Sequence, residues 1–301
     1  MYKTQNLLLL AITFCFAACK QESEQELKPE TSSKITIGQV SDAAPASIPS
    51  GCIAAYMFNY NTDPVDQTGI CRGVKRLTLK RTGGATTEYN TISWGYGLNG
   101  IKPNSFYNLG DNNAYSAPAG GVMTISVWMM PVSAGVLTTG RPYPVMLFES
   151  TEQTGYVHWM GKGRIDQQEW AFRIYSGNNT DDPNRNNRMS FYHWASTGGK
   201  GPGCYIEEEV KTNKWIHLVT IIDRVNHTFE YYKNGMPRDT VNYTNTSYAI
   251  QDSEIRNGTA GLQLGSKDGS SFFKGAIDNL FIYHRRLSPA EIQQLYADKT
   301  P

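Results

Sequence analysis

The sequence has almost no net charge. Its 28 lysines and arginines are balanced by 27 aspartates and glutamates, which leaves a formal charge of +1 at pH 7. A protein that binds a nucleic-acid backbone carries clustered lysine and arginine on a basic surface. The charge balance therefore argues against nucleic acid as a partner.

The apolar run at the N-terminus is too short to cross a bilayer as a helix. It extends from Leu7 to Ala18, whereas a spanning helix needs about 20 residues. A lysine precedes the run and small residues end it, directly before Cys19. These are the parts of a secretory signal, so residues 1–18 are predicted to be a signal peptide.

Ala17-Ala18-Cys19 resembles the lipobox of bacterial lipoproteins, in which the cysteine becomes the acylated first residue of the mature chain. The alternative is an ordinary signal peptide with an incidental cysteine. Residues 19–50 are rich in Glu, Ser, Lys, Pro and Ala and nearly free of aromatics, a composition that predicts a flexible tether. We expect lipidation at Cys19, with the membrane contacted only through the lipid. The protein would lie in the cell envelope, on the outer membrane facing outside or the periplasm.

Cysteine is scarce, with five residues in the chain. Beyond the signal region only Cys52, Cys71 and Cys204 are available to pair. Three is an odd number, so one disulfide and one spare thiol are expected in an oxidising compartment. Cys52–Cys71 is the local pairing, and Cys71–Cys204 is the alternative.

Helical periodicity is rare after residue 50, and alternation of apolar and polar residues replaces it. Alternation is typical of half-buried strands, and a tight hairpin is expected at Asn234-Gly235 because both residues accept a positive φ. The predicted strands are 123–129, 169–175, 189–194, 215–223 and 229–232. Residues 51–301 are of a size that fits one β-domain.

The C-terminus is the exception, because it carries the start signals of a helix. Ser288 is placed as the N-cap, Pro289 as the first helical residue and Glu291 as the third. This is a capping box, with Leu287 and Ile292 in the positions of a hydrophobic staple. One short helix is therefore predicted to end an otherwise all-β chain.

Four segments resemble laminin-G-like domains, a family of the concanavalin-A-like lectin and glucanase type. The closing segment, Gly275 to Ile292, is the most specific match; Trp215–Val219, Tyr232–Gly235 and Thr124–Trp128 resemble central strands, and Tyr56–Gly69 resembles the opening strand and loop. The resemblance covers about residues 51–298. It implies an all-β fold: a two-sheet antiparallel jelly-roll sandwich with one short C-terminal helix. Fold alone assigns no function.

The sequence lacks the carboxylate pattern of glucanases on this fold. Those enzymes use a Glu-x-Asp-x-x-Glu strand that projects two carboxylates from one face. Glu207-Glu208-Glu209 is contiguous and is interpreted as a solvated edge, and Glu149 and Glu152 have opposite strand parity. No nucleophile elbow, phosphate loop or His-Glu-x-x-His is present. A non-enzyme is predicted.

The family resemblance also implies a structural calcium ion. In lectin and glucanase sandwiches such an ion ties the first strand region to an aspartate of the last strand. Asp278 stands at the matching place and Asp66 lies in the early loop that would approach it. Carboxylate oxygens are ligands that calcium prefers. The alternative is that Asp278 accepts hydrogen bonds from backbone amides.

Aromatic and polar side chains concentrate between residues 156 and 194. Sugar rings need flat aromatic faces beside hydrogen-bonding groups, and the candidates for glycan binding are Trp194, Trp159, Tyr192, His158, Arg173 and Tyr175. Trp194 and Trp159 are the first choices, because each precedes a glycine-rich stretch. In the strand 189–194 one parity carries Phe191 and the other Tyr192 and Trp194, so one set is expected in the core.

The sequence thus predicts a lipid-anchored, extracytoplasmic carbohydrate-binding protein. Two alternatives remain open: an adhesion or scaffold module that binds a protein partner, and a glycoside hydrolase with an unfamiliar site. A protein partner would favour an exposed apolar patch of several hundred Å². A hydrolase would need two carboxylates about 5–9.5 Å apart in a cleft.

Overall fold

In the computed structural model the chain divides into two compact units, and the described residues belong to the second unit, Asp42–Pro301. The described residues are 48–56, 80–82, 106–131, 149–150, 156–163, 169–175, 188–195, 201–206, 208, 210, 214–265, 271–272 and 275–298. Cys19, most of the tether and Asp66 lie outside them. Within these ranges no helix is long and apolar enough to cross a membrane.

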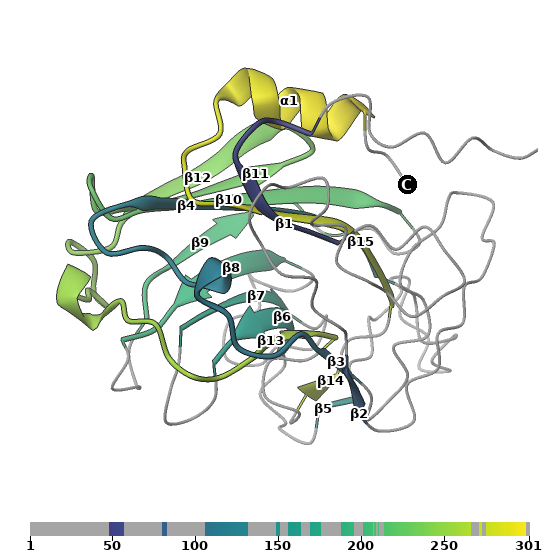
Figure 1. Ribbon diagram of the computed structural model, residues 1–301, viewed down its shortest axis with the longest axis horizontal. Helices are drawn as coiled ribbons and strands as arrows, with labels where there is room; N and C mark the ends of the chain where they lie inside the picture. Colours follow the sequence, from purple (N-terminus) through teal and green to yellow (C-terminus); the bar gives the residue numbers. More distant parts are fainter. Residues whose placement is uncertain are drawn as a thin grey trace, which may run out of the picture. The chain divides into compact units, whose positions relative to one another are not determined.

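Six strands form the first antiparallel sheet, in the spatial order β1-β15-β4-β10-β11-β12 (Figure 1). Their bounds are β1 Cys52–Tyr56, β4 Val122–Pro131, β10 Ile216–Asp223, β11 Thr228–Lys233, β12 Met236–Asn242 and β15 Gly275–Tyr283. The first and last strands of the chain pair with each other, so the closing segment that carries the resemblance is built into the sheet.

Seven strands form the second antiparallel sheet, in the order β2-β3-β13-β6-β7-β8-β9. Their bounds are β2 Lys80–Thr82, β3 Phe106–Asn108, β6 Tyr156–Lys162, β7 Trp170–Tyr175, β8 Met189–His193, β9 Gly203–Ile206 and β13 Leu262–Leu264. A further pair is made by β5 Glu149–Ser150 and β14 Ser271–Phe272. The predicted two-sheet antiparallel sandwich is confirmed.

The core fills the space between the two sheets. Alternate residues of the central strands enter it, including Val127 of β4, Leu218 of β10 and Phe172 of β7, all fully buried in one apolar cluster. Ring contacts cross the interior: the centroids of Phe172 and Tyr231 lie 5.9 Å apart. Side chains that point away from this core are therefore the ones available for function.

The predicted C-terminal helix is α1, Pro289–Asp298 (Figure 1). The capping box forms, because the Glu291 carboxylate accepts the Ser288 backbone N–H at 2.8 Å and the Ser288 hydroxyl accepts the Glu291 N–H at 3.3 Å. Ile292 and Leu295 are buried in a second apolar cluster that also contains Phe281 and other residues on the outer side of the six-stranded sheet. The helix thus covers that side.

His217 lies on the same outer side and is buried between the sheet and α1. Its Nε2 is 2.8 Å from the Ser126 hydroxyl, and its ring lies 5.1 Å from that of Trp128 and 6.1 Å from that of Tyr296 in α1. Burial lowers the pKa of His217 to about 3. His217 is therefore a packed residue of the sheet.

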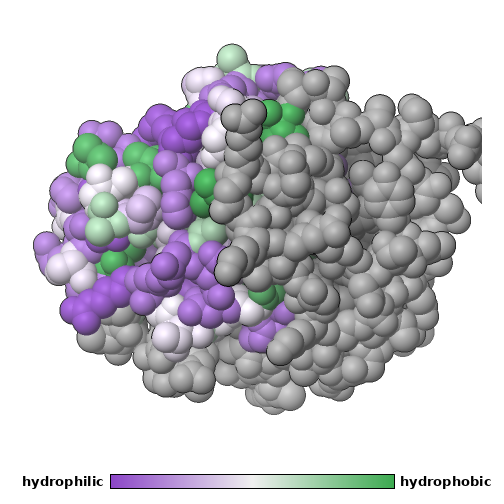
Figure 2. Space-filling view, in the orientation of Figure 1, coloured by the Kyte–Doolittle hydropathy of each residue, from purple (hydrophilic) through white to green (hydrophobic). Residues whose placement is uncertain are grey.

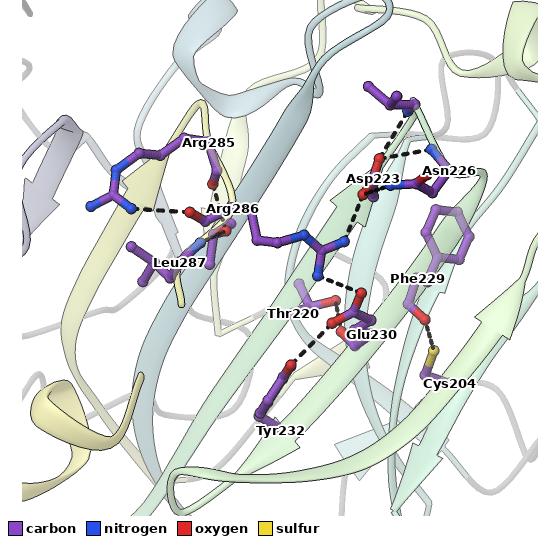
Figure 3. Close-up of polar contacts among 12 residues, drawn as sticks. Cys204, Thr220, Asp223, Asn226, Phe229, Glu230, Tyr232, Arg285, Arg286 and Leu287 are labelled. Atoms are coloured by element: carbon purple, nitrogen blue, oxygen red, sulfur yellow. Dashed lines mark hydrogen bonds and ion pairs between the residues drawn. The ribbon is translucent and has the colours of Figure 1, made fainter. Parts of the chain in front are cut away.

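A polar network joins the closing segment to the central hairpin (Figure 3). The Arg286 guanidinium donates to Asp223 at 2.6 Å and to Glu230 at 2.5 Å. Burial alone would raise the pKa of Asp223, but the hydrogen bonds from Arg286 and Asn226 outweigh it and lower that pKa to about 2. This network therefore fastens the segment after β15 to β10 and β11, and its role is structural.

The hairpin predicted at Asn234-Gly235 joins β11 to β12. Both residues have a positive φ, 51° for Asn234 and 77° for Gly235, as this type of tight turn requires. The Asn234 side chain accepts the backbone N–H of His217 at 3.0 Å. The turn residues therefore also fix the end of β10.

Candidate ligand-binding face

Alternation along β7 and β8 separates a core side from an outward side. Phe172 and Phe191 are paired across the two strands and lie in the core. Arg173 pairs with Ser190 on the opposite side, and its guanidinium Nε donates to the Ser190 hydroxyl at 3.3 Å. Strand β9 continues the pattern, because Tyr205 pairs with Ser190. We call the outward side the aromatic face; it comprises His158, Arg173, Tyr175, Ser190, Tyr192, Trp194 and Tyr205.

Five of the six predicted glycan-binding residues meet on this face, and Trp159 does not. Trp159 has no exposed surface and packs against Phe172 in the core, with ring centroids 5.2 Å apart. The choice of Trp159 as an exposed ring was therefore wrong. The physical reason is strand alternation: His158 pairs with Arg173 on the outward side, so the next residue points into the core, and the bulge in β6 between His158 and Met160 then keeps Met160 in the core as well.

Trp194 follows directly after β8 and is half-buried. Its ring centroid lies 5.2 Å from that of His158, edge to face, and 5.9 Å from that of Tyr192. The backbone N–H of Trp194 donates to the Glu169 carbonyl at 2.8 Å. Because backbone and neighbouring rings hold it, the indole is a pre-oriented flat surface with part of its area open to solvent.

Arg173 supports the centre of the face. Its guanidinium carbon lies 3.8 Å from the centroid of the Tyr192 ring and 4.7 Å from that of Tyr175. The Nη2 atom donates to the Tyr175 hydroxyl at 2.5 Å. Only 8% of Arg173 is exposed, so it positions the rings by cation–π contact rather than presenting its charge openly.

Tyr205 is a member of the face that the sequence interpretation missed. Its hydroxyl hydrogen-bonds that of Tyr192, and burial raises its pKa. Its backbone N–H donates to the Asp239 carboxylate of β12 at 2.7 Å. Gly203 lies beside them, and a Cβ there would come within 2.7 Å of the Tyr192 ring. Glycine at this position therefore lets the Tyr192 ring lie close over β9.

A second polar cluster surrounds Lys162, which sequence reasoning also missed. The Lys162 ammonium is completely buried, 2.5 Å from Glu169 and 3.1 Å from Asp111. It also donates to the Gly258 carbonyl at 2.8 Å and to the Asn257 side chain at 3.3 Å. Burial raises the pKa of Glu169, although Lys162 opposes the shift. Oxygen atoms thus enclose the ammonium on several sides, as they would a structural cation.

Of the two predicted calcium ligands, Asp278 and Asp66, the described residues include Asp278. Asp278 of β15 is fully buried, and its Oδ1 accepts the Asn279 backbone N–H at 2.7 Å, which agrees with the alternative role given to it. Among the described residues no group of three His, Cys, Asp or Glu side chains is placed to hold a metal ion. One buried carboxylate fits a single ligand position, and Asp66 lies outside the described residues, so calcium stays a prediction.

Two cysteines fall within the described residues. Cys52 is disulfide-bonded and Cys204 is a buried free thiol. The alternative that Cys204 pairs with Cys71 is therefore wrong. Cys71, the expected partner of Cys52, lies outside the described residues.

The glutamates weighed as catalytic groups are partly described. Glu208 is exposed and pairs with Lys233 at 3.0 Å and Arg238 at 3.1 Å, which agrees with a solvated edge. Glu207, Glu209 and Glu152 lie outside the described residues. Burial of the Cys204 thiol raises its pKa, so it is not an activated nucleophile.

Two stacked antiparallel sheets with an aromatic outer face define a lectin-type β-sandwich. The chain belongs to the concanavalin A-like lectin/glucanases superfamily, because a laminin-G family model of that description matches residues 108–293. No curated protein sequence matches the chain.

Solved structures with a similar fold include receptor-binding domains of botulinum neurotoxins. The chain resembles that of neurotoxin D with 15% identity and a TM-score of 0.52, covering 83% of this chain and 53% of that one. The neurotoxin DC domain in complex with rat synaptotagmin II gives 14% identity, a TM-score of 0.54 and coverages of 83% and 52%. A structure of neurotoxin C, whose cell entry depends on two ganglioside molecules, has 12% identity and a TM-score of 0.51. The match covers 82% of this chain and 51% of that one. The chain spans about half the length of these structures, and the likeness is one of fold.

Proposed function

We propose that this protein is a carbohydrate-binding module whose ligand contacts the aromatic face. The observation that carries the proposal is the half-buried pair of rings at Trp194 and Tyr192, 5.9 Å apart and inclined by only 34°. Sugars present flat C–H patches that pack on such rings, and hydroxyls that need polar neighbours. The part-buried hydroxyls of Tyr192 and Tyr205 supply such polar groups beside the rings.

The comparisons support a binding role of this general kind. The similar neurotoxin structures include a receptor-binding domain, a binding domain in complex with the protein synaptotagmin II, and a neurotoxin whose cell entry depends on gangliosides. A protein partner is therefore the second candidate function. Large exposed apolar side chains among the described residues are Val225, Met236 and Tyr248, and hydrophilic residues lie between the apolar ones on the face shown in Figure 2. This distribution favours a glycan over an apolar protein-docking patch.

A panel of purified polysaccharides and glycolipid headgroups tests the proposal. The full-length protein should bind at least one of them, and Trp194→Ala should lower that binding by about ten-fold or more, since stacking on one ring is worth about 1–3 kcal/mol in comparable base–aromatic contacts. Binding to no glycan, together with saturable capture of a protein, would replace the proposal by the adhesion alternative.

The lipid anchor is proposed on the sequence alone, from Ala17-Ala18-Cys19 and the polar tether. Acylation of Cys19 would hold the sandwich near a membrane surface, with residues 20–50 as the spacer. Changing Cys19 to Ser should move the protein out of the membrane fraction or leave its signal uncleaved. A variant that is processed and fractionated like the wild type would show that Cys19 carries no lipid.

Structural calcium is proposed from the family resemblance, with Asp278 and Asp66 as ligands. An ion that binds only the folded state stabilises it by about 2.7 kcal/mol at a hundredfold excess over its dissociation constant. The melting temperature should therefore rise when calcium replaces EDTA, and Asp278→Asn should remove the difference. Equal melting temperatures of the wild type in both buffers would end the calcium proposal.

A further inference from the structure

The strands of the aromatic face carry positive charge and no carboxylate. The sequences of β6, β7, β8 and β9 contain no aspartate or glutamate. Arg173 lies at the centre of β7, and Arg188 comes immediately before β8. An anionic ligand would thus meet no carboxylate from these four strands, and the Asp239 carboxylate of β12, which contacts Tyr205, already accepts the Tyr205 backbone N–H.

Arg188 belongs to the same face by its register. The Tyr175 backbone N–H donates to the Arg188 carbonyl at 2.9 Å, which extends the β7–β8 ladder by one pair beyond Ile174 and Met189. Side chains alternate along a strand, so Arg188 shares the outward side with Ser190 and stands opposite Tyr175.

Arg188 differs in its partners from the three arginines that form ion pairs on other parts of the described structure. Arg224, Arg285 and Arg286 each contact a carboxylate at 2.6–2.8 Å. Arg188 is half-buried, its Nε is buried without a hydrogen bond, and no carboxylate of the described residues pairs with it. A buried guanidinium N–H without an acceptor is unfavourable, so turning this half-buried side chain toward a bound anion would break no hydrogen bond of Nε and would supply the missing acceptor.

Resting on the proposed function, we infer that the ligand of the aromatic face is an acidic polysaccharide whose carboxylate or sulfate group is bound by Arg188. The guanidinium fork matches both anions in a bidentate geometry. The neighbouring half-buried rings of Tyr192 and Trp194 would contact the sugar rings beside the charged group. Arg188 is therefore the specificity residue of the face, and Arg173 holds the rings beneath it.

Matched polymers separate this inference from the proposed function. The full-length protein is titrated with polygalacturonate, with its fully methyl-esterified form, with dextran sulfate and with unmodified dextran. Each pair shares one sugar backbone and differs in charge. We expect tighter binding to the charged member of at least one pair, and the pair that responds identifies carboxylate or sulfate as the group recognised.

Three variants locate the charge that is responsible. Arg188→Ala should weaken binding to the acidic polymer by about ten-fold or more, because a hydrogen bond to a charged group is worth about 1.5–3 kcal/mol. Arg188→Lys should retain part of the affinity, since it keeps the charge and loses the fork. Arg256→Ala, which removes an exposed arginine bound to the Ser253 carbonyl, should change nothing.

Equal binding of charged and neutral polymers, or an unchanged affinity in Arg188→Ala, would overturn the acidic-ligand inference and leave carbohydrate binding intact. Binding to neutral glycans of the wider panel alone would do the same. Failure to bind any glycan would instead overturn the proposed function, and with it this inference.

Discussion

Replacing Lys162 with methionine should lower the free energy of unfolding by about 3–5 kcal/mol, the usual cost of removing one partner from a buried ion pair. The substitution leaves the Glu169 carboxylate, 2.5 Å from the ammonium in the wild type, buried without its cation. It also removes the donor to the Gly258 carbonyl and the Asn257 side chain. Denaturant unfolding followed by circular dichroism measures the change.

The matched control is Lys233→Met. Lys233 pairs with Glu208 at a similar distance, 3.0 Å, but the Glu208 side chain is 47% exposed. Water can therefore replace the lost partner, and the change should stay within about 1 kcal/mol. Equal effects of the two substitutions would show that the buried Lys162–Glu169 pair is no more important for stability than the solvent-exposed pair. Combining Lys162→Met with Glu169→Gln should recover part of the loss, because the uncompensated charge is gone.

Replacing Trp159 with alanine should cost about 3–5 kcal/mol of stability, the range for truncating a large aromatic residue in a core. Trp159 is fully buried and packs against Phe172 within the main apolar cluster. Thermal melting and denaturant unfolding give the magnitude.

Trp194→Ala is the comparison for Trp159→Ala, because it removes the same side chain from a half-buried position. Its effect on stability should be clearly smaller. A melting temperature that falls equally in both variants would show that Trp194 is a packing residue as well, and would remove it from the proposed site.

Much of the sandwich was predictable because its strands obey simple alternation. In β8 the prediction that Tyr192 and Phe191 point to opposite sides is confirmed, with Phe191 in the core. The capping box at Ser288 was predictable for a similar reason: each of its hydrogen bonds joins residues three apart in the chain.

Alternation places Trp159 on the side opposite His158, so the two residues could not both belong to the aromatic face; it fails one residue later, at Met160, which the bulge in β6 keeps in the core. No local sequence signal marks that bulge, since its cause lies in the pairing with β7. Arg188 was missed because its importance depends on its having no carboxylate partner among the described residues, which only the folded arrangement reveals. Lys162 was missed because Glu169, Asp111 and Asn257 come together from three separate segments.

The most direct test of the central claim is calorimetric titration of Trp194→Ala, beside the wild type, with a polysaccharide that the wild type binds. The proposal predicts an affinity lowered by about ten-fold or more, with a melting temperature close to that of the wild type. An affinity equal to that of the wild type, measured on a variant that melts normally, would contradict the assignment of the aromatic face as the binding site.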